Sequence, residues 1–137
     1  MTTSRKMPRA YWAATIVFAL LLLLDGLGGV AGSRQGEEAL LHLGYPLYLM
    51  QLLGALKLLA AVAILQTRFS AIKEWAYAGF AFNCLGAFVA RLAAGDGGLD
   101  LLFPWIFFLF AAVPYALWKL TIRSDGHRFA GLNNASI

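Results

Sequence analysis

The sequence predicts an all-α integral membrane protein, a four-helix up-down bundle with both termini in the cytoplasm. Hydrophobic residues make up 61% of the 137-residue chain and charged residues 13%, whereas soluble domains carry roughly 25% charged residues. The apolar residues fall into four runs of about 20 residues, the length at which a helix crosses ~30 Å of hydrocarbon. Basic residues gather near the ends of these runs, where they set the orientation of a membrane protein.

The charge and cysteine content exclude several soluble functions. The net charge is +4, but the basic residues accompany no nucleic-acid motif, so no nucleic-acid partner is expected. The lone cysteine, Cys84, excludes an intrachain disulfide, a CxxC redox pair and a Cys-based zinc site, and we expect it to be a small core residue. No metal site is predicted, and no catalytic set of residues is recognisable.

The first half of the chain predicts two spans. Residues 1–10 form a basic cytoplasmic segment, and residues 11–31 form the first span. A cleaved signal peptide is the alternative for this segment, but its apolar run is long for the hydrophobic region of such a peptide. The polar connection 32–44 holds a short amphipathic helix near 37–43. The second span covers residues 46–65, with Pro46 in its first turn.

The second half predicts two more spans. A basic turn at 66–73 leads into the third span, residues 74–94, with Ser70 as a candidate N-cap. Trp75 and Tyr77 suit the membrane interface. After a turn at 95–100, the fourth span covers residues 101–122, with Pro104 in its first turn and Pro114 as a kink. Residues 123–137 read as a loosely ordered, polar cytoplasmic tail.

The distribution of charge predicts the topology. If four spans alternate, one side of the membrane receives Arg5, Lys6, Arg9, Arg68, Lys73, Lys119, Arg123 and Arg128, and the other receives Arg34 and Arg91. The basic side is the cytoplasm by the positive-inside rule. Short loops make consecutive spans antiparallel neighbours. We expect close packing at small-residue patterns, namely Gly28/Gly32, Gly79 with Asn83 and Ala87, and Gly86/Ala90/Ala94.

Polar side chains inside the predicted spans are the candidate ligand-binding residues, because an ionisable group in hydrocarbon is costly unless it faces protein or water. At ~1.5 Å per residue, Lys57 and Asn83 share a depth near the midplane. Asp25 and Arg91 form an outer layer, to which Gln51 is added. These five side chains are the predicted site.

A structural role remains open for each charge. Lys57 could anchor an anionic or carbonyl ligand or act as a tuned acid or base, or it could pair with Asp25 or extend its amine to the interface. We expect Asp25 and Arg91 to form an ion pair that locks two helices, with the mouth of a polar cavity as the functional alternative. Asn83 alone would read as an interhelical hydrogen bond.

A family resemblance rests on the middle of the chain. The stretch KEWAYAGF from Lys73 to Phe80 follows a helix with the pattern Gly54-x-x-Lys57-Leu58. With Gly44-Tyr45-Pro46, Gly86-Ala87 and Ala94-Gly95-Asp96, this stretch resembles the DoxX-like family of small four-span membrane proteins over about 50 residues. Arg91 stands where relatives have a histidine, and residues 67–70 replace a proline-bearing turn.

The resemblance implies a four-helix bundle in the bacterial inner (cytoplasmic) membrane. Some broader relatives are similar to membrane subunits of quinone-reducing sulfur oxidoreductases, and a distant branch is similar to a receptor-assembly chaperone. We therefore expect an auxiliary, non-catalytic module of a membrane redox or stress-detoxification system, with no intrinsic cofactor and with a quinone or similar small amphipathic ligand bound in the bundle. If the chain takes part in catalysis, we expect it to be part of a quinone-linked oxidoreductase.

The expected partners are membrane lipids, other membrane redox proteins and a second copy of the chain. Two alternatives stay open. The chain could be a helix-packing scaffold or assembly factor for other membrane proteins. A small transporter is less favoured, because four short spans without a repeat need an oligomer to form a path.

Overall fold

The computed structural model describes residues 7–135 of the chain, so predictions that concern residues 1–6, among them Arg5 and Lys6, and residues 136–137 lie outside the described residues. The described part is all-α. Its helices are α1 (Arg9–Ala31), α2 (Arg34–His42), α3 (Tyr48–Leu65), α4 (Ser70–Ala94) and α5 (Leu99–Ala135). Four of these five helices, α1, α3, α4 and α5, are long and apolar enough to cross a membrane.

The helix ends follow local sequence signals. The Ser33 hydroxyl caps α2 by accepting a hydrogen bond from the Gly36 backbone at 3.3 Å. Gly32 and Gly95 end α1 and α4 in the left-handed conformation, with φ of 76° and 83°, which glycine adopts without steric cost. The predicted Ser70 cap is wrong, because α4 already includes Ser70 and begins after Phe69. The Gln66 amide instead holds that turn by bonding both backbone groups of Phe69.

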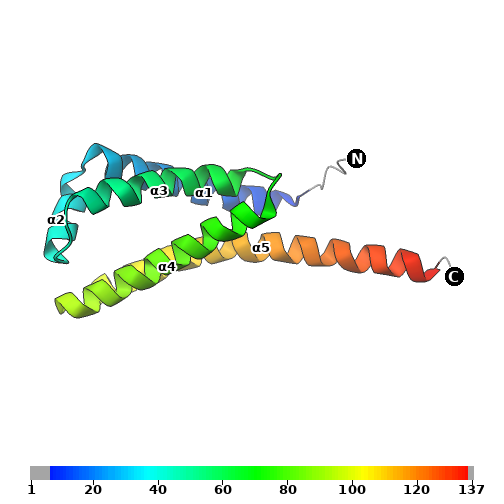
Figure 1. Ribbon diagram of the computed structural model, residues 1–137. Coiled ribbons are helices and arrows are strands. Elements are labelled where there is room, and N and C mark those ends of the chain that lie inside the picture. The colour runs from blue at the N-terminus through cyan, green and yellow to red at the C-terminus, as the bar shows by residue number, and fades with distance from the viewer. Residues whose placement is uncertain (1–6, 136–137) are drawn as a thin grey trace.

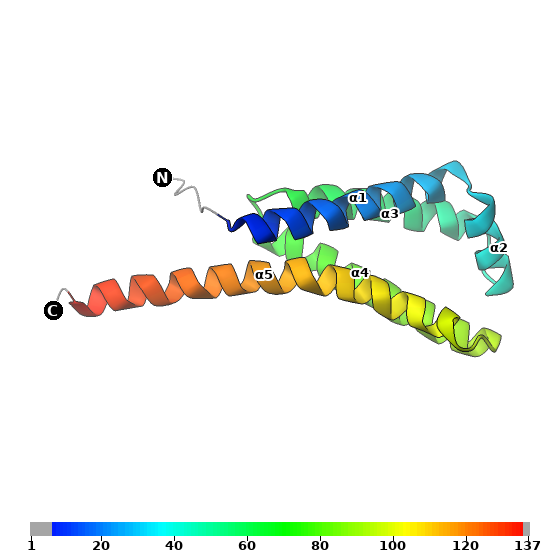
Figure 2. The same ribbon diagram turned by 180° about the vertical axis from the view of Figure 1, so that it is seen from behind.

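The last helix differs most from its prediction. The tail after residue 122 was expected to be loosely ordered, but α5 continues as one helix to Ala135. No proline follows Pro114, so nothing removes a helical hydrogen bond there. Pro104 lies inside α5 and not in its first turn. Figure 2 shows α5 as a continuous helix that bends along its length, as expected for a helix that contains proline.

The spanning helices form two antiparallel pairs. Figure 1 shows α1 beside α3 and α4 beside α5, with consecutive spans running in opposite directions. The packing order is α1 on α3, α3 on α4, α4 on α5, and α5 back on α1. The pairs meet near the start of α1 and diverge toward α2 and the α4–α5 turn. The up-down order of the spans therefore agrees with the prediction, but the bundle is splayed at one end.

Glycines explain why α1 and α3 form the tightest pair. A β-carbon on Gly54 of α3 would lie 2.7 Å from the Val30 backbone nitrogen and 2.8 Å from the Gly26 carbonyl oxygen of α1. Gly29 of α1 also lies close to α3, because its β-carbon would be 3.0 Å from the α-carbon of Gly54. The sequence predicted close helix packing at other glycines, and for α4 this prediction is wrong. A β-carbon added at Gly79 or Gly86 would have no other atom within 4 Å.

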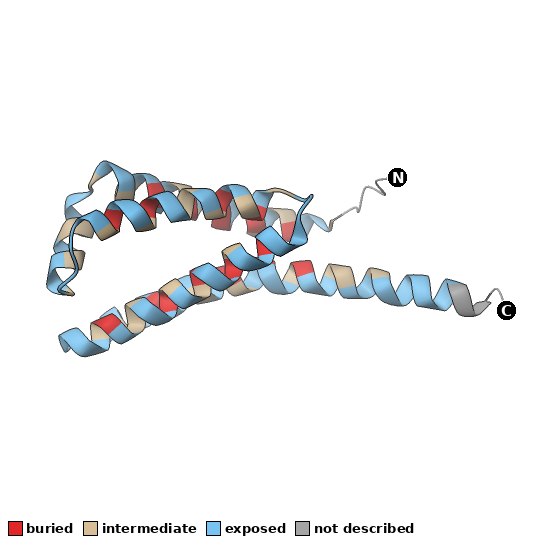
Figure 3. Ribbon diagram, in the orientation of Figure 1, coloured by how far each residue is buried: buried red, intermediate tan, exposed pale blue. Residues whose placement is uncertain are grey.

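A small aromatic core joins the two pairs. Phe18 of α1 stacks on Tyr77 of α4 with ring centroids 6.1 Å apart, and it meets Phe80 edge-on at 5.1 Å. Cys84 is buried in the same cluster. Figure 3 shows that buried residues follow the facing sides of the helices and that the remaining surface is exposed or intermediate. Exposed apolar side chains such as Leu24, Leu59 and Phe82 are 66–72% accessible, which suits a surface that faces lipid.

Lys73 occupies an unexpected place in this core. Lys73 stands at the end of the predicted basic turn, but its exposed fraction is only 2%. The ammonium donates a hydrogen bond to the Tyr11 hydroxyl and lies 5.2 Å and 5.3 Å from the ring centroids of Tyr11 and Trp118. Cation–π contacts of this kind stabilise a desolvated ammonium. Lys73 thus ties α1, α4 and α5 together where the helix pairs meet.

Candidate ligand site between the helix pairs

A cavity of about 470 Å³ lies between the diverging helix pairs. Its polar walls come from Asp25 of α1, Lys57 of α3, and Asn83 and Arg91 of α4. The remaining lining is mostly apolar and aromatic and includes Leu49, Leu53, Phe80, Phe103, Pro104 and Phe107. Small-molecule sites combine such a volume and apolar lining with a few polar groups that orient the ligand.

Lys57 and Asp25 form an ion pair on the α1/α3 side of this cavity. The Lys57 ammonium donates a hydrogen bond to Oδ2 of Asp25. The close approach at Gly26 and Gly54 sets Asp25 beside the turn of α3 that carries Lys57. The side chains are 23% and 55% exposed, respectively. A ligand in the cavity can therefore reach both charges without any change in the helix packing.

Asn83 faces Lys57 from the other helix pair. Both residues line the central cavity, and both also line a second, smaller cavity between α3 and α4. Their predicted common depth agrees with this arrangement. The Lys57 ammonium and the Asn83 amide can each donate hydrogen bonds to a carbonyl or anionic oxygen, so the polar pair can orient a ligand in the cavity.

Gln51 does not join the other predicted site residues. It is exposed and is absent from the lining of the central cavity. The cavity-facing positions of α3 are Leu49, Leu53 and Lys57, which are spaced by four residues. Gln51 lies two residues from the first two of these, which turns its side chain to another face of the helix.

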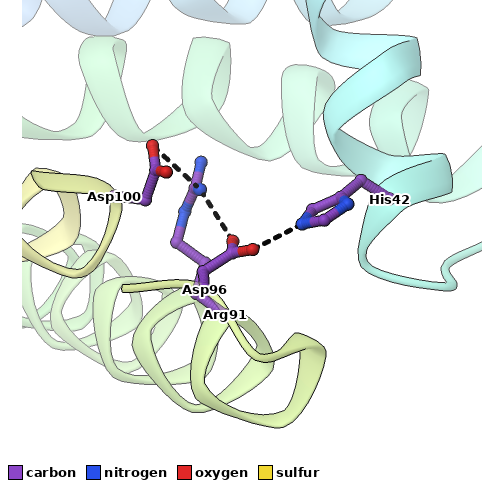
Figure 4. Close-up of polar contacts among 4 residues, drawn as sticks. All are labelled: His42, Arg91, Asp96 and Asp100. Carbon is purple, nitrogen blue, oxygen red and sulfur yellow. Dashed lines mark hydrogen bonds and ion pairs between the residues drawn. The ribbon is translucent and has the colours of Figure 1, made fainter. Parts of the chain in front are cut away.

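A four-residue polar cluster lies at the end of the cavity beside α2 and the α4–α5 turn, which we call the outer end after the orientation predicted from the sequence (Figure 4). His42 of α2 donates through Nε2 to Oδ1 of Asp96 at 2.5 Å, because an ionised carboxylate only accepts. Arg91 contacts the other oxygen of Asp96 at 3.2 Å and Oδ1 of Asp100 at 3.8 Å. The Asp96 side chain is only 9% exposed. The cluster joins α2 to the α4–α5 turn, and so links the two helix pairs at the end where they diverge.

This cluster perturbs the acidity of Asp96. The hydrogen bond from His42 and the charge of Arg91 hold the pKa of the Asp96 carboxyl below its usual range, although partial burial acts in the opposite direction. Asp96 therefore stays ionised to a lower pH than an isolated aspartate. The negative charge remains available to hold both His42 and Arg91.

The expected ion pair between Asp25 and Arg91 is not formed. Asp25 pairs with Lys57, and Arg91 pairs with Asp96 and Asp100. The prediction failed because equal depth in the membrane does not specify which sides of the two helices face each other. The alternative partner that the sequence offers for Asp25 is Lys57, and the structure confirms this pair.

Sequence reasoning missed the role of His42 and Asp96. They are 54 positions apart, and each stands in a polar connection where charged residues are ordinary. The sequence predicts the turn at 95–100 that carries Asp96, but nothing in that turn indicates a partner on α2. The aromatic residues of the fourth span are expected from the sequence to face lipid or neighbouring helices, with an aromatic wall beside Lys57 as the alternative. In the structure Phe103 and Phe107 line the cavity and remain 48% and 42% exposed.

The four apolar helices and their lipid-compatible surface define the chain as a multi-pass membrane protein. The DoxX-like family model matches residues 13–113, which is well over half of the chain, and the protein belongs to that family. The matched region includes every residue named in the cavity lining. No curated protein and no solved structure matches the chain.

Proposed function

We propose that this DoxX-like protein binds a small amphipathic ligand, such as a quinone, in the cavity between its helix pairs. The observation that carries the proposal is the lining of that cavity, in which an ammonium and an amide stand among apolar and aromatic side chains. Quinone carbonyls accept hydrogen bonds of the kind that Lys57 and Asn83 can donate. The rings of Phe80, Phe103 and Phe107 suit a flat ring beside these donors.

In this proposal the chain has no catalytic residue of its own. It is an auxiliary module of a redox or stress-detoxification complex in the cytoplasmic membrane of a bacterium, and other membrane redox proteins exchange electrons with the bound ligand. Asp25 sets the position of the Lys57 ammonium, and Arg91 and Asp96 lie at the outer end of the same cavity.

The test is native mass spectrometry of the gently purified protein, with chemical identification of bound lipids and quinones. We expect a stoichiometric small molecule on the wild type that is lost in Lys57→Met. The matched control is Lys119→Met, which removes a lysine paired with Glu74 outside the cavity and should keep the ligand. A wild type without a bound molecule, or the same molecule on Lys57→Met, contradicts the proposal.

A scaffold for other membrane proteins is the second candidate function. The observation that favours it is that Lys57 already has a partner within the chain, so this charge does not need a ligand. A scaffold predicts that Lys57→Met chiefly lowers thermal stability in detergent and changes the set of co-purified proteins. Lost ligand binding with an unchanged set of partners would contradict it.

A further inference from the structure

Two cavities meet at the Lys57–Asn83 pair. Besides the central cavity, a groove of about 250 Å³ lies between α3 and α4. Four residues, Leu53, Lys57, Phe80 and Asn83, line both. The polar pair therefore forms part of a shared boundary, and a molecule whose head lies beside Lys57 has space on either side of it.

The groove leads from this boundary toward the opposite end of the molecule. On α3 its lining steps from Leu53 through Lys57 to Ala60, and on α4 from Asn83 through Gly79 to Trp75. Seven residues of helix span roughly 10 Å. Apart from Lys57 and Asn83, the lining is apolar except for the indole nitrogen of Trp75, and Trp75 is 77% exposed. Gly79 lines the groove, and a β-carbon at this position would project into open space, with no other atom within 4 Å.

The central cavity offers a less suitable exit at its outer end. There the contact between His42 and Asp96 connects α2 to the α4–α5 turn, and Arg91 and Asp100 add further charge (Figure 4). A hydrocarbon chain that left by this route would pass four polar side chains. The apolar groove between α3 and α4 imposes no such desolvation cost.

We propose that the groove between α3 and α4 is the passage by which the hydrocarbon tail of the ligand reaches the lipid. This inference rests on the proposed function and narrows its ligand class to a bilayer-dissolved amphiphile, with one polar head at Lys57 and Asn83 and one tail along Gly79. Lipid tails are as apolar as the groove, so the tail gains little free energy there. The groove sets which molecules can enter, while the head supplies the affinity.

The experiment compares two quinones on the full-length protein in lipid nanodiscs. One quinone carries a decyl tail, and the other has the same ring with a methyl group in place of the tail. Gly79→Leu fills the groove, and Gly126→Leu is the matched control, since a β-carbon at Gly126 also meets nothing within 4 Å and Gly126 lines neither cavity. Leu56→Trp, which enlarges a half-exposed side chain of the groove, is the second variant if Gly79→Leu does not fold.

We expect Gly79→Leu to weaken binding of the decyl quinone about tenfold and to leave the methyl quinone within about twofold. Lys57→Met should weaken both about tenfold or more, since it removes a charged hydrogen-bond donor to the head. Gly126→Leu should change neither. A photoreactive group at the end of the decyl tail should label the peptide around Trp75 in the wild type.

The outcomes separate this inference from the function on which it rests. If the wild type binds both quinones through Lys57 but Gly79→Leu affects neither, or weakens both equally, the groove is not the passage and the proposed function stands. If the wild type binds neither quinone, the proposed function fails and the passage fails with it.

Discussion

At the scale of single residues, the environment of each lysine decides what it contributes. Lys57 pairs with Asp25 beside a cavity and is 23% exposed, Lys119 pairs with Glu74 and is 43% exposed, and Lys73 is buried against aromatic rings. Exposed ion pairs contribute about 0–1 kcal/mol, whereas leaving one partner of a partly buried pair alone costs more. These three residues should therefore respond differently to the same substitution.

The Lys57–Asp25 pair is expected to stabilise the fold. Asp25 lies within a candidate membrane span, where a lone carboxylate is costly. Lys57→Met leaves Asp25 without its ammonium and should lower the free energy of unfolding by about 1–3 kcal/mol. Lys119→Met should lower it by no more than about 1 kcal/mol. Thermal unfolding in detergent measures both. The double variant Lys57→Met/Asp25→Leu should recover most of the loss, since no lone charge remains. Equal instability of the single and double variants would show that the lone Asp25 carboxylate is not the cause of the loss.

The polar cluster at the outer end predicts a pH dependence. Because the pKa of Asp96 is lowered in the folded protein, its stabilising effect is fully present above the ordinary aspartate pKa of about 3.9 and is lost as the pH falls through the lowered folded value. The difference in melting temperature between wild type and Asp96→Asn should be constant from about pH 5 to 6 and should shrink below about pH 4. An unchanged difference at low pH would contradict the assignment.

At the scale of elements, α1 and α3 depend on backbone contact and α4 does not. The backbones of α1 and α3 approach closely at Gly26, Gly29 and Gly54. A β-carbon added at any of these glycines would lie within about 3 Å of the partner helix. In α4, Gly79 and Gly86 border open space. Glycines that look equivalent in the sequence thus have different roles. Those of α1 and α3 allow close helix packing, and those of α4 border open space.

Alanine substitutions separate these two roles. Gly54→Ala forces a methyl group against the backbone of α1 and should destabilise the protein by about 1–3 kcal/mol. Gly86→Ala meets no neighbour and should be neutral or stabilise α4 by up to about 1 kcal/mol. Chemical denaturation in detergent would compare the two, and a Gly54→Ala protein as stable as wild type would rule out the close approach.

At the scale of the whole molecule, the two helix pairs are joined by two contacts, one at each end of the bundle. Lys73 with Tyr11 and Trp118 closes the narrow end, and His42 with Asp96 joins the wide end. The cavity lies between these contacts, and its walls need both pairs. The orientation of this arrangement in the membrane remains a prediction from the basic residues, which places the narrow end toward the cytoplasm.

Cysteine labelling tests that orientation. In a Cys84→Ala background, Thr67→Cys lies in the α3–α4 turn and Gly97→Cys in the α4–α5 turn, both at exposed positions. With a membrane-impermeant maleimide on intact cells, we expect Gly97→Cys to react at once and Thr67→Cys only after the membrane is opened. The reverse pattern would place both termini outside.

The sequence by itself determined the class and the four spans, and it predicted a common depth for Lys57 and Asn83. Apolar length and charge bias are local properties of a chain, and depth follows from the rise per residue. The rise per residue predicts that Lys57 and Asn83 lie at one depth. In the structure both residues line the boundary between two cavities. The continuation of α5 past residue 122 was missed because its last part is polar and offers no membrane signal.

Only the tertiary structure decided how each helix is turned about its axis. Helices that are apolar on nearly every side carry no amphipathic stripe that would reveal which face is inward. The partners of Asp25 and Arg91, the packing role of Gly54, the burial of Lys73 and the exclusion of Gln51 all depend on that rotation. Contact between helices sets it, and that contact arises between segments far apart in the chain.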